Sequence, residues 1–163
     1  LVPGPVSVEV ISEKYDDMLA ESKKIAKIRN NICVKLPCTF DGLRVCRNLS
    51  SEGISTNVTL CFSPTQALLA AKCGATYVSP FIGRLDDVGH DGISLVEQLV
   101  DIFDMHGYET KVLAASVRSL QHVIQSAMLG VGAITLPPQI LKQCFDHPLT
   151  IKGLEIFAKD WKR

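Results

Sequence analysis

One lysine inside a short apolar stretch is the residue of this sequence best suited to chemistry. Residues 32–37 read Ile-Cys-Val-Lys-Leu-Pro, a β-branched run that ends at a proline and predicts a short buried strand. Because side chains alternate between the two faces of a strand, Lys35 shares a face with Cys33, opposite Val34 and Leu36. Such a lysine is either an edge residue whose ammonium reaches water or an amine nucleophile that forms a Schiff base with a carbonyl substrate.

Polar residues recur at every second position near the ends of other predicted strands. The sets that share a strand face are Ser7 with Glu9, Asn57 with Thr59, and Tyr77 with Ser79 and Phe81, while Ser116 and Thr135 are single polar positions. A structural core does not need so many hydrogen-bonding groups in one place. The pattern is therefore typical of an active site assembled around Lys35.

The elements that must position these residues alternate along the whole chain. Strands are expected at 6–10, 32–36, 56–62, 76–81, 111–116 and 133–136, and helices at 15–28, 39–53, 63–74, 93–106, 120–129 and, in amphipathic form, after Pro138. Strict β-then-α alternation predicts a parallel sheet covered by helices, either an open doubly wound sheet or a closed (β/α)8 barrel. Polar residues at period two favour the barrel, whose active site lies at the carboxyl ends of the strands.

Composition and charge exclude several classes of partner. At 163 residues and 47% hydrophobic content, residues 1–163 predict a single domain with one core. Lys plus Arg and Asp plus Glu both number 17, so neither a nucleic acid nor an anionic membrane is indicated as a partner. No apolar run is long enough to span a membrane, and residues 1–6 lack the features of a signal peptide. The six cysteines lack CxxC spacing, which favours reduced thiols and a cytoplasmic location.

The acidic loop at residues 86–91 is the stretch most similar to a metal site. It reads Asp-Asp-Val-Gly-His-Asp, but it lacks the ligand spacing of a calcium loop, and the four histidines include no pair at ligand spacing. We therefore interpret the loop as a solvated turn and expect no metal.

Four motifs in sequence order carry a family resemblance. Val-Lys-Leu-Pro at 34–37, Thr-Asn-Val-Thr-Leu at 56–60, Ser-Pro-Phe-Ile-Gly-Arg at 79–84 and Ala-Ala-Ser-Val-Arg at 114–118 resemble successive active-site strands of transaldolase. The similarity extends along the whole chain and is greatest to the small subfamily that includes fructose-6-phosphate aldolase. The resemblance implies a (β/α)8 TIM barrel of class I aldolase type. It further implies transfer of a dihydroxyacetone unit between sugar phosphates through a lysine Schiff base, in the pentose phosphate pathway, without metal or cofactor.

The resemblance also implies a role for individual residues. Lys35 matches the Schiff-base lysine, and Glu9 and Thr59 match the pair that holds a catalytic water. Asn57 and Ser79 match residues that bind hydroxyl groups of the donor.

Four further residues match positions around the same pocket. Ser116 matches a pocket-lining residue, and Arg84 and Arg118 match positions that grip the substrate phosphate, which suits a planar fork of fixed charge. Phe81 stands where the fructose-6-phosphate aldolase branch has tyrosine, so we expect transfer to an acceptor rather than simple cleavage.

The sequence departs from the family in its number of units. It supplies six of the eight βα units, and the family's first two, which carry an acid/base aspartate and a substrate-contacting asparagine, have no counterpart in it. We expect those units to be encoded upstream. The alternatives to a transaldolase are a fructose-6-phosphate aldolase-like enzyme and a non-catalytic truncated barrel that acts in self-assembly. The small subfamily forms rings of subunits, so we expect a homo-oligomer with helix 150–163 either in the core or at a subunit interface.

Overall fold

The computed structural model describes residues 2–162, in which parallel strands alternate with helices as predicted. The strands are β1 (Val6–Glu9), β2 (Ile32–Pro37), β3 (Thr56–Cys61), β4 (Tyr77–Pro80), β5 (Lys111–Ala114) and β6 (Ala133–Ile134). The helices are α1 (Tyr15–Ala26), α2 (Phe40–Ser51), α3 (Pro64–Lys72), α4 (Ile82–Asp86), α5 (Gly92–His106), α6 (Leu120–Met128), α7 (Pro138–Gln143) and α8 (Pro148–Trp161).

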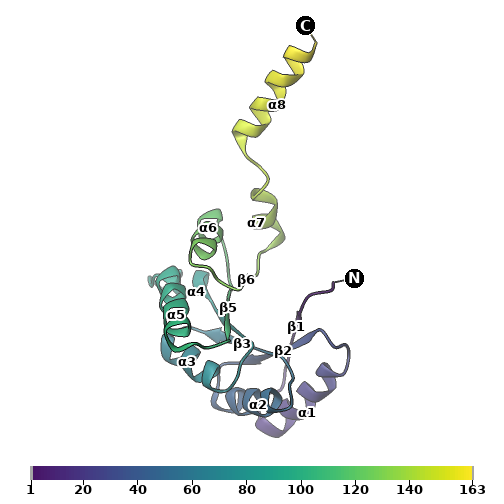
Figure 1. Cartoon of the computed structure of the whole chain (residues 1–163), viewed down its shortest axis with the longest axis vertical. Helices are drawn as coiled ribbons and strands as arrows, with labels where there is room; N and C mark the ends of the chain where they lie inside the picture. Colours follow the sequence, from purple (N-terminus) through teal and green to yellow (C-terminus); the bar gives the residue numbers. More distant parts are fainter. Residues whose placement is uncertain (1, 163) are drawn as a thin grey trace.

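The strands form one curved parallel sheet in the order β1-β2-β3-β4-β5-β6. Helices α1, α2, α3 and α5 cover its outer side, and β1 and β6 form the two edges (Figure 1). The sheet is therefore a partial (β/α)8 barrel, open between its first and last strands. The register pairs Glu9 with Lys35 and Lys35 with Asn57, which sets these three residues side by side across β1, β2 and β3.

Side-chain caps begin the helices where the sequence predicts. The Thr39 hydroxyl accepts a hydrogen bond from Gly42 N at 3.1 Å, and the Ser63 hydroxyl accepts one from Gln66 N at 3.3 Å. The Gln66 side chain accepts from Phe62 N at 2.9 Å, one residue earlier than in a standard capping box. These caps set the point at which the chain leaves β2 and β3 and turns back over the sheet.

The hydrophobic core lies between the outer face of the sheet and the helices. Its fully buried members include Val34, Leu36, Val58 and Val78 from the strands and Met18, Val45, Leu49, Val96 and Leu99 from the helices. Val34 and Leu36 face this core, as the period-two pattern predicts. Lys35 and its polar neighbours lie on the opposite, concave face of the sheet.

Two local features differ from the prediction. Helix α4 forms at residues 82–86, inside a segment expected to be a loop, and β6 is two residues long instead of four. Strand β6 pairs with β5 on one side, and two prolines, Pro137 and Pro138, follow it closely. Because proline donates no backbone hydrogen bond, the ladder ends early.

The carboxyl-terminal region forms two helices, α7 and α8, with a break between them. The break falls at His147–Pro148, where the His147 ring accepts a hydrogen bond from Leu149 N at 3.2 Å. Helix α8 projects away from the barrel and has no buried residue (Figure 1). Phe157 is 70% exposed and Trp161 92%, so these side chains do not belong to the core of this chain.

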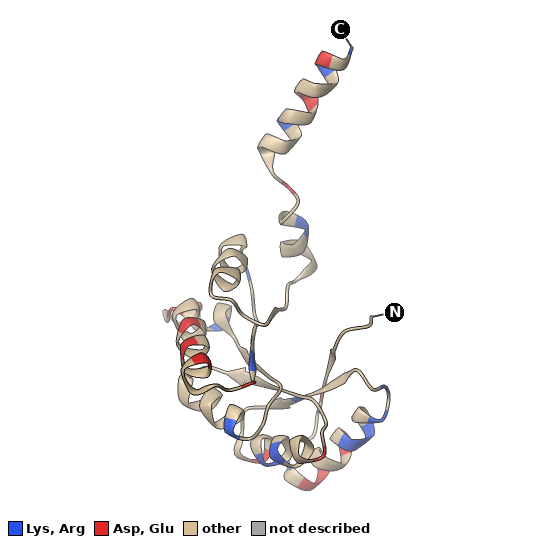
Figure 2. Cartoon of the chain, viewed as in Figure 1, with Lys and Arg blue, Asp and Glu red and all other residues tan. Residues whose placement is uncertain are grey.

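The charged residues lie mainly on the outer helices (Figure 2). On α5, the acidic residues Glu97, Asp101 and Asp104 are all exposed. Among residues 2–162, no helix is both long enough and apolar enough to cross a membrane.

Candidate active site

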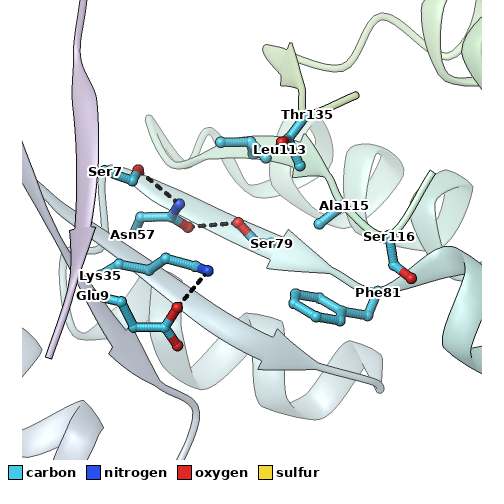
Figure 3. A pocket seen from close by; sticks show the side chains of 10 residues that line it. All are labelled: Ser7, Glu9, Lys35, Asn57, Ser79, Phe81, Leu113, Ala115, Ser116 and Thr135. Carbon is cyan, nitrogen blue, oxygen red and sulfur yellow. Dashed lines mark hydrogen bonds and ion pairs between the residues drawn. The ribbon is translucent and has the colours of Figure 1, made fainter. Parts of the chain in front are cut away.

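A cavity of about 420 Å³ lies on the concave face of the sheet (Figure 3). Its lining comes from β1 to β5 and the segments that follow β4, β5 and β6, namely Ser7, Glu9, Lys35, Asn57, Ser79, Phe81, Leu113, Ala115, Ser116 and Thr135. Six of the nine predicted site residues line this cavity: Glu9, Lys35, Asn57, Ser79, Phe81 and Ser116. The remaining three, Thr59, Arg84 and Arg118, do not.

Lys35 and Glu9 form a direct ion pair in this cavity. The Lys35 Nζ lies 2.8 Å from Glu9 Oε2, and the two side chains are 23% and 49% exposed. Lys35 is therefore only partly buried, although its strand was predicted to be a buried one. Because β1 is an edge strand in the described chain, Glu9 is open to solvent on one side, and the register places it directly beside Lys35.

Asn57 is held by two hydroxyl groups on the cavity wall. Its Nδ2 donates to Ser7 Oγ at 3.1 Å, and its Oδ1 accepts from Ser79 Oγ at 2.6 Å (Figure 3). Asn57 and Ser79 are almost fully buried, so each of these hydrogen bonds satisfies a group that water does not reach easily. Ser7 was not predicted as a site residue, although its period-two relation to Glu9 was a usable signal.

Thr59, which was predicted to hold a water together with Glu9, is not among the residues that line this cavity. The register sets Thr59 opposite Pro37, two residues beyond the Lys35–Asn57 pair, and the β3–β4 register then shifts between Val58 and Cys61. Thr59 is fully buried, and its hydroxyl has no hydrogen-bond partner within residues 2–162. This hydroxyl is therefore a polar group with unused hydrogen-bonding capacity.

Phe81 and Ser116 form the rim of the cavity at the ends of β4 and β5. The Phe81 ring meets Phe62 edge-on, with 5.9 Å between centroids, and the Arg84 guanidinium lies 4.9 Å from its centroid. Ser116 has a positive φ of 58°, an unfavourable conformation for a residue with a side chain, and its carbonyl accepts from Gly83 N at 3.1 Å. The two rim loops are thus tied to each other through their backbones.

The two predicted phosphate-binding arginines lie on the exposed surface outside this rim. Both terminal nitrogens of Arg118 donate to the carboxylate of Asp87, Nη2 to Oδ2 at 2.7 Å. This hydrogen bonding with the guanidinium holds the pKa of Asp87 below its usual value and raises the pKa of Arg118. The fork of Arg118 is therefore already occupied by an internal carboxylate.

The acidic loop at 86–91 uses its carboxylates for contacts within the protein. Asp86 accepts from Gly92 N at 3.0 Å and pairs with His122 at 3.1 Å, and Asp91 caps α5. Within residues 2–162, no group of three or more His, Cys, Asp or Glu side chains is arranged to hold a metal ion.

Cys33 lies two residues before Lys35, on the same strand face, and is fully buried. Burial raises the pKa of its thiol to about 12, because desolvation disfavours the thiolate. The thiol is therefore protonated at neutral pH and does not compete with the lysine as a nucleophile.

Three further residues that line the cavity were not predicted as site residues, namely Leu113, Ala115 and Thr135. Leu113 and Ala115 are apolar, so nothing in the sequence distinguishes them from core residues. Thr135 was noted as the polar position of the last strand, and it lies across the cavity from the Lys35 side (Figure 3).

Together, the curved parallel sheet and its lysine-containing pocket define a partial barrel of the (β/α)8 type. Solved structures support the fold: a 3-keto-L-gulonate-6-phosphate decarboxylase from Vibrio cholerae has a TM-score of 0.62 and 10% identity, over 80% of this chain and 61% of that one. The 4-hydroxy-2-oxoglutarate aldolase/2-deydro-3-deoxyphosphogluconate aldolase from TTHB1 has a TM-score of 0.56 and 18% identity, over 82% and 58%. At this identity the similarity concerns the fold alone.

The sequence comparisons identify the family. A model of the family "Transaldolase/Fructose-6-phosphate aldolase" matches residues 1–163. Proteins described as "Probable transaldolase" are 58% identical in Caulobacter sp. (strain K31), over 99% of this chain and 74% of the relative, and 55% identical in Rhizobium meliloti (strain 1021), over 100% and 75%. The chain belongs to the transaldolase/fructose-6-phosphate aldolase family. It spans about three quarters of the length of these relatives.

Proposed function

We propose that this chain carries the Schiff-base centre of a transaldolase, which transfers a dihydroxyacetone unit from a ketose phosphate to an aldose phosphate. The observation that supports it best is the Lys35 amine at the wall of a polar cavity, 2.8 Å from a carboxylate. A carboxylate in direct contact stabilises an ammonium ion, so Lys35 must first pass a proton to Glu9, because only the neutral amine attacks a carbonyl. The direct contact gives that proton a path without an intervening water.

The proposed chemistry begins at the ketone carbon of the donor. The Lys35 amine adds to this carbon, and loss of the carbonyl oxygen as water leaves an iminium ion. The iminium accepts the electron pair of the adjacent carbon–carbon bond as that bond breaks, so an aldose phosphate leaves and an enamine stays on Lys35. The enamine then attacks the acceptor aldehyde, and hydrolysis releases the new ketose and the free amine. No residue of this chain is assigned to removing the hydroxyl proton during bond cleavage.

Other residues of the site bind the substrate in this proposal. Asn57 and Ser79 hydrogen-bond donor hydroxyls, and Ser116 lines the same pocket. Glu9 and Thr59 hold the water that enters and leaves the cycle, which is supported by the unused hydroxyl of buried Thr59. Arg84 and Arg118 bind the phosphate at the rim.

The proposed assignment favours transfer over cleavage because the rim residue is Phe81. A phenylalanine offers no hydroxyl to protonate the enamine carbon, so the enamine persists until an acceptor aldehyde arrives. On this proposal the enzyme belongs to the pentose phosphate pathway in the cytoplasm, a compartment in which free thiols such as the six of this chain persist.

Reductive trapping tests the proposal directly. The chain is incubated with fructose 6-phosphate and borohydride, and the adduct is mapped by peptide mass analysis. We expect a reduced adduct on Lys35 and its loss in Lys35→Met. The matched control is Lys23→Met, because Lys23 also pairs with a carboxylate, Glu52, at 2.6 Å but lies far from the cavity. An adduct on Lys23 equal to that on Lys35, or none on Lys35, refutes the proposal.

We further propose that the protein is a homo-oligomer and that α8 packs against a second copy. The support is the exposure of its apolar side chains, among them Leu154 at 62% and Trp161 at 92%. If trapping fails and assembly persists, the second candidate function, a non-catalytic barrel that acts in self-assembly, is favoured.

A further inference from the structure

An acidic residue occupies the arginine fork next to the cavity. Asp87 directly follows α4, and its two carboxylate oxygens accept from the two terminal nitrogens of Arg118. Arg84, three residues earlier on α4, adds a second positive charge that also lowers the pKa of Asp87. The basic rim is thus partly neutralised from within the chain.

The Arg118 side chain packs against the neighbouring backbone at Gly83. A Cβ on Gly83 would lie 2.7 Å from Arg118 Nε and 2.9 Å from its Cδ, so the side chain passes directly over this glycine. Arg118 is two residues from Ser116, which lines the cavity. Its fork is therefore held on the surface beside the rim, by packing against Gly83 as well as by Asp87.

The adjacent aspartates Asp86 and Asp87 make different contacts. Asp86 binds Gly92 N and His122, and the His122 ring in turn accepts from Arg118 N at 3.3 Å, so Asp86 holds the two loops together. Within residues 2–162, the hydrogen bonds of the Asp87 carboxylate are with Arg118. Its release would leave the loop contacts of Asp86 intact.

We propose that Asp87 is an internal counter-ion that the substrate phosphate displaces, and that its charge restricts the site to dianionic phosphate esters. The inference rests on the proposed function for its substrate class. Carboxylate and phosphate bind a guanidinium with the same two-point geometry, so one can replace the other. A monoanionic carboxylate ligand that replaces Asp87 at the Arg118 guanidinium carries the same charge as Asp87. A dianionic phosphate carries one more negative charge than Asp87 and is therefore attracted more strongly. Both side chains are 49% exposed, and a surface ion pair of this kind costs little to exchange.

Removal of the Asp87 charge tests this role. Asp87→Asn is titrated with inorganic phosphate and, separately, with acetate, while the Arg118 Nε–H resonance is followed by NMR. We expect phosphate to bind about fivefold more tightly than to wild type, the upper value for one exposed ion pair, and acetate to begin to shift the resonance. Asp87→Glu keeps the charge and should stay near wild type.

The matched control is Asp41→Asn, which removes the carboxylate of another exposed pair, with Arg44 at 3.1 Å on α2. It should bind phosphate like wild type, because the same charge is lost far from the rim. Weaker or unchanged phosphate binding in Asp87→Asn overturns the proposal and makes Asp87 a residue that positions Arg118. An Arg118 resonance that phosphate never shifts overturns it as well.

A separate experiment distinguishes this failure from failure of the proposed function. Borohydride trapping with dihydroxyacetone involves Lys35 but no phosphate. Absence of that adduct, together with the expected phosphate titrations, refutes the Schiff-base function and leaves the displacement of Asp87. Presence of the adduct, together with unchanged phosphate binding in Asp87→Asn, refutes the displacement of Asp87 and leaves the Schiff-base function.

Discussion

Asn57 presents a specific hydrogen-bonding pattern to the cavity. A side-chain amide has two donor hydrogens and two acceptor lone pairs, and in Asn57 one of each is used by Ser7 and Ser79. One donor and one acceptor therefore remain for a ligand. The Ser79 hydroxyl has given its hydrogen to Asn57 and can only accept. This combination suits a hydroxyl group, which both donates and accepts, and it agrees with the proposed polyol substrate.

Phe81→Tyr tests the choice between transfer and cleavage. A tyrosine hydroxyl at this rim position could protonate the enamine carbon or position a water that does so, and either would release free dihydroxyacetone. We therefore expect the variant to split fructose 6-phosphate without an acceptor at least about tenfold faster than wild type, which is less than the roughly 10²–10⁴-fold usual for a well-positioned general acid. The measurement is release of glyceraldehyde 3-phosphate in a coupled assay.

Phe62→Tyr is the control for this experiment. Phe62 stacks edge-on against Phe81 but is not part of the cavity lining, so a hydroxyl there should leave cleavage unchanged. Efficient cleavage by the wild-type chain in the absence of an acceptor would contradict the transaldolase assignment.

Helix α2 approaches the end of β2 closely enough to require a glycine. A Cβ on Gly42 would lie 2.0 Å from the carbonyl oxygen of Pro37, and that oxygen belongs to the backbone and cannot move aside. We expect Gly42→Ala to lower the free energy of unfolding by about 1–3 kcal/mol, the usual cost of overpacking. Urea denaturation followed by circular dichroism measures the loss.

Gly153→Ala is the matched control on an exposed helix. A Cβ at this position of α8 meets no atom within 4 Å, and alanine is a better helix former than glycine by about 1 kcal/mol. The variant should unfold no earlier than wild type. Equal destabilisation by both substitutions would show that close packing of α2 on β2 is not the cause.

The first and last strands of the described chain each have one edge that pairs with no other strand. Strands β1 and β6 are the edges of the sheet, and a parallel edge exposes unpaired backbone donors and acceptors. Ser7 and Glu9 on β1, and Thr135 just after β6, are accordingly exposed, whereas Asn57 and Ser79 on central strands are buried. The cavity is therefore closed at its centre and open at its two sides.

The proposed packing of α8 on a second copy predicts a specific loss of assembly. The double variant Phe157→Ser and Trp161→Ser removes two of the most exposed apolar side chains of α8. We expect wild type to be oligomeric by analytical ultracentrifugation and the variant to dissociate, because apolar burial is the main driving force for such an interface.

Met128→Ser is the control for assembly, because Met128 is 82% exposed on α6 and is not part of α8. It should leave the oligomer intact. A monomeric wild type, or equal dissociation by Met128→Ser, would contradict the role of α8.

The order of elements and the direction of the key side chains were determined by the sequence alone. The capping residues Thr39 and Ser63 predicted two helix starts, and period two placed Lys35 opposite Val34, as the structure confirms. These signals are local, because a helix cap involves only three or four consecutive residues and alternation involves a single strand. The motifs at 34–37 and 114–118 likewise predicted the family, which the comparisons confirm.

The distances between functional groups were decided by the tertiary structure. The Ser7–Asn57 and Asp87–Arg118 hydrogen bonds join residues 50 and 31 positions apart, and the direct Glu9–Lys35 pair depends on the register of β1 against β2. Thr59 pairs with Pro37, two residues farther along β3 than Asn57 on the same strand face, and is not part of the cavity lining. Alternation along one strand determines the face on which a side chain lies. The register and curvature between strands determine which side chains come into contact, and both depend on packing across the sheet.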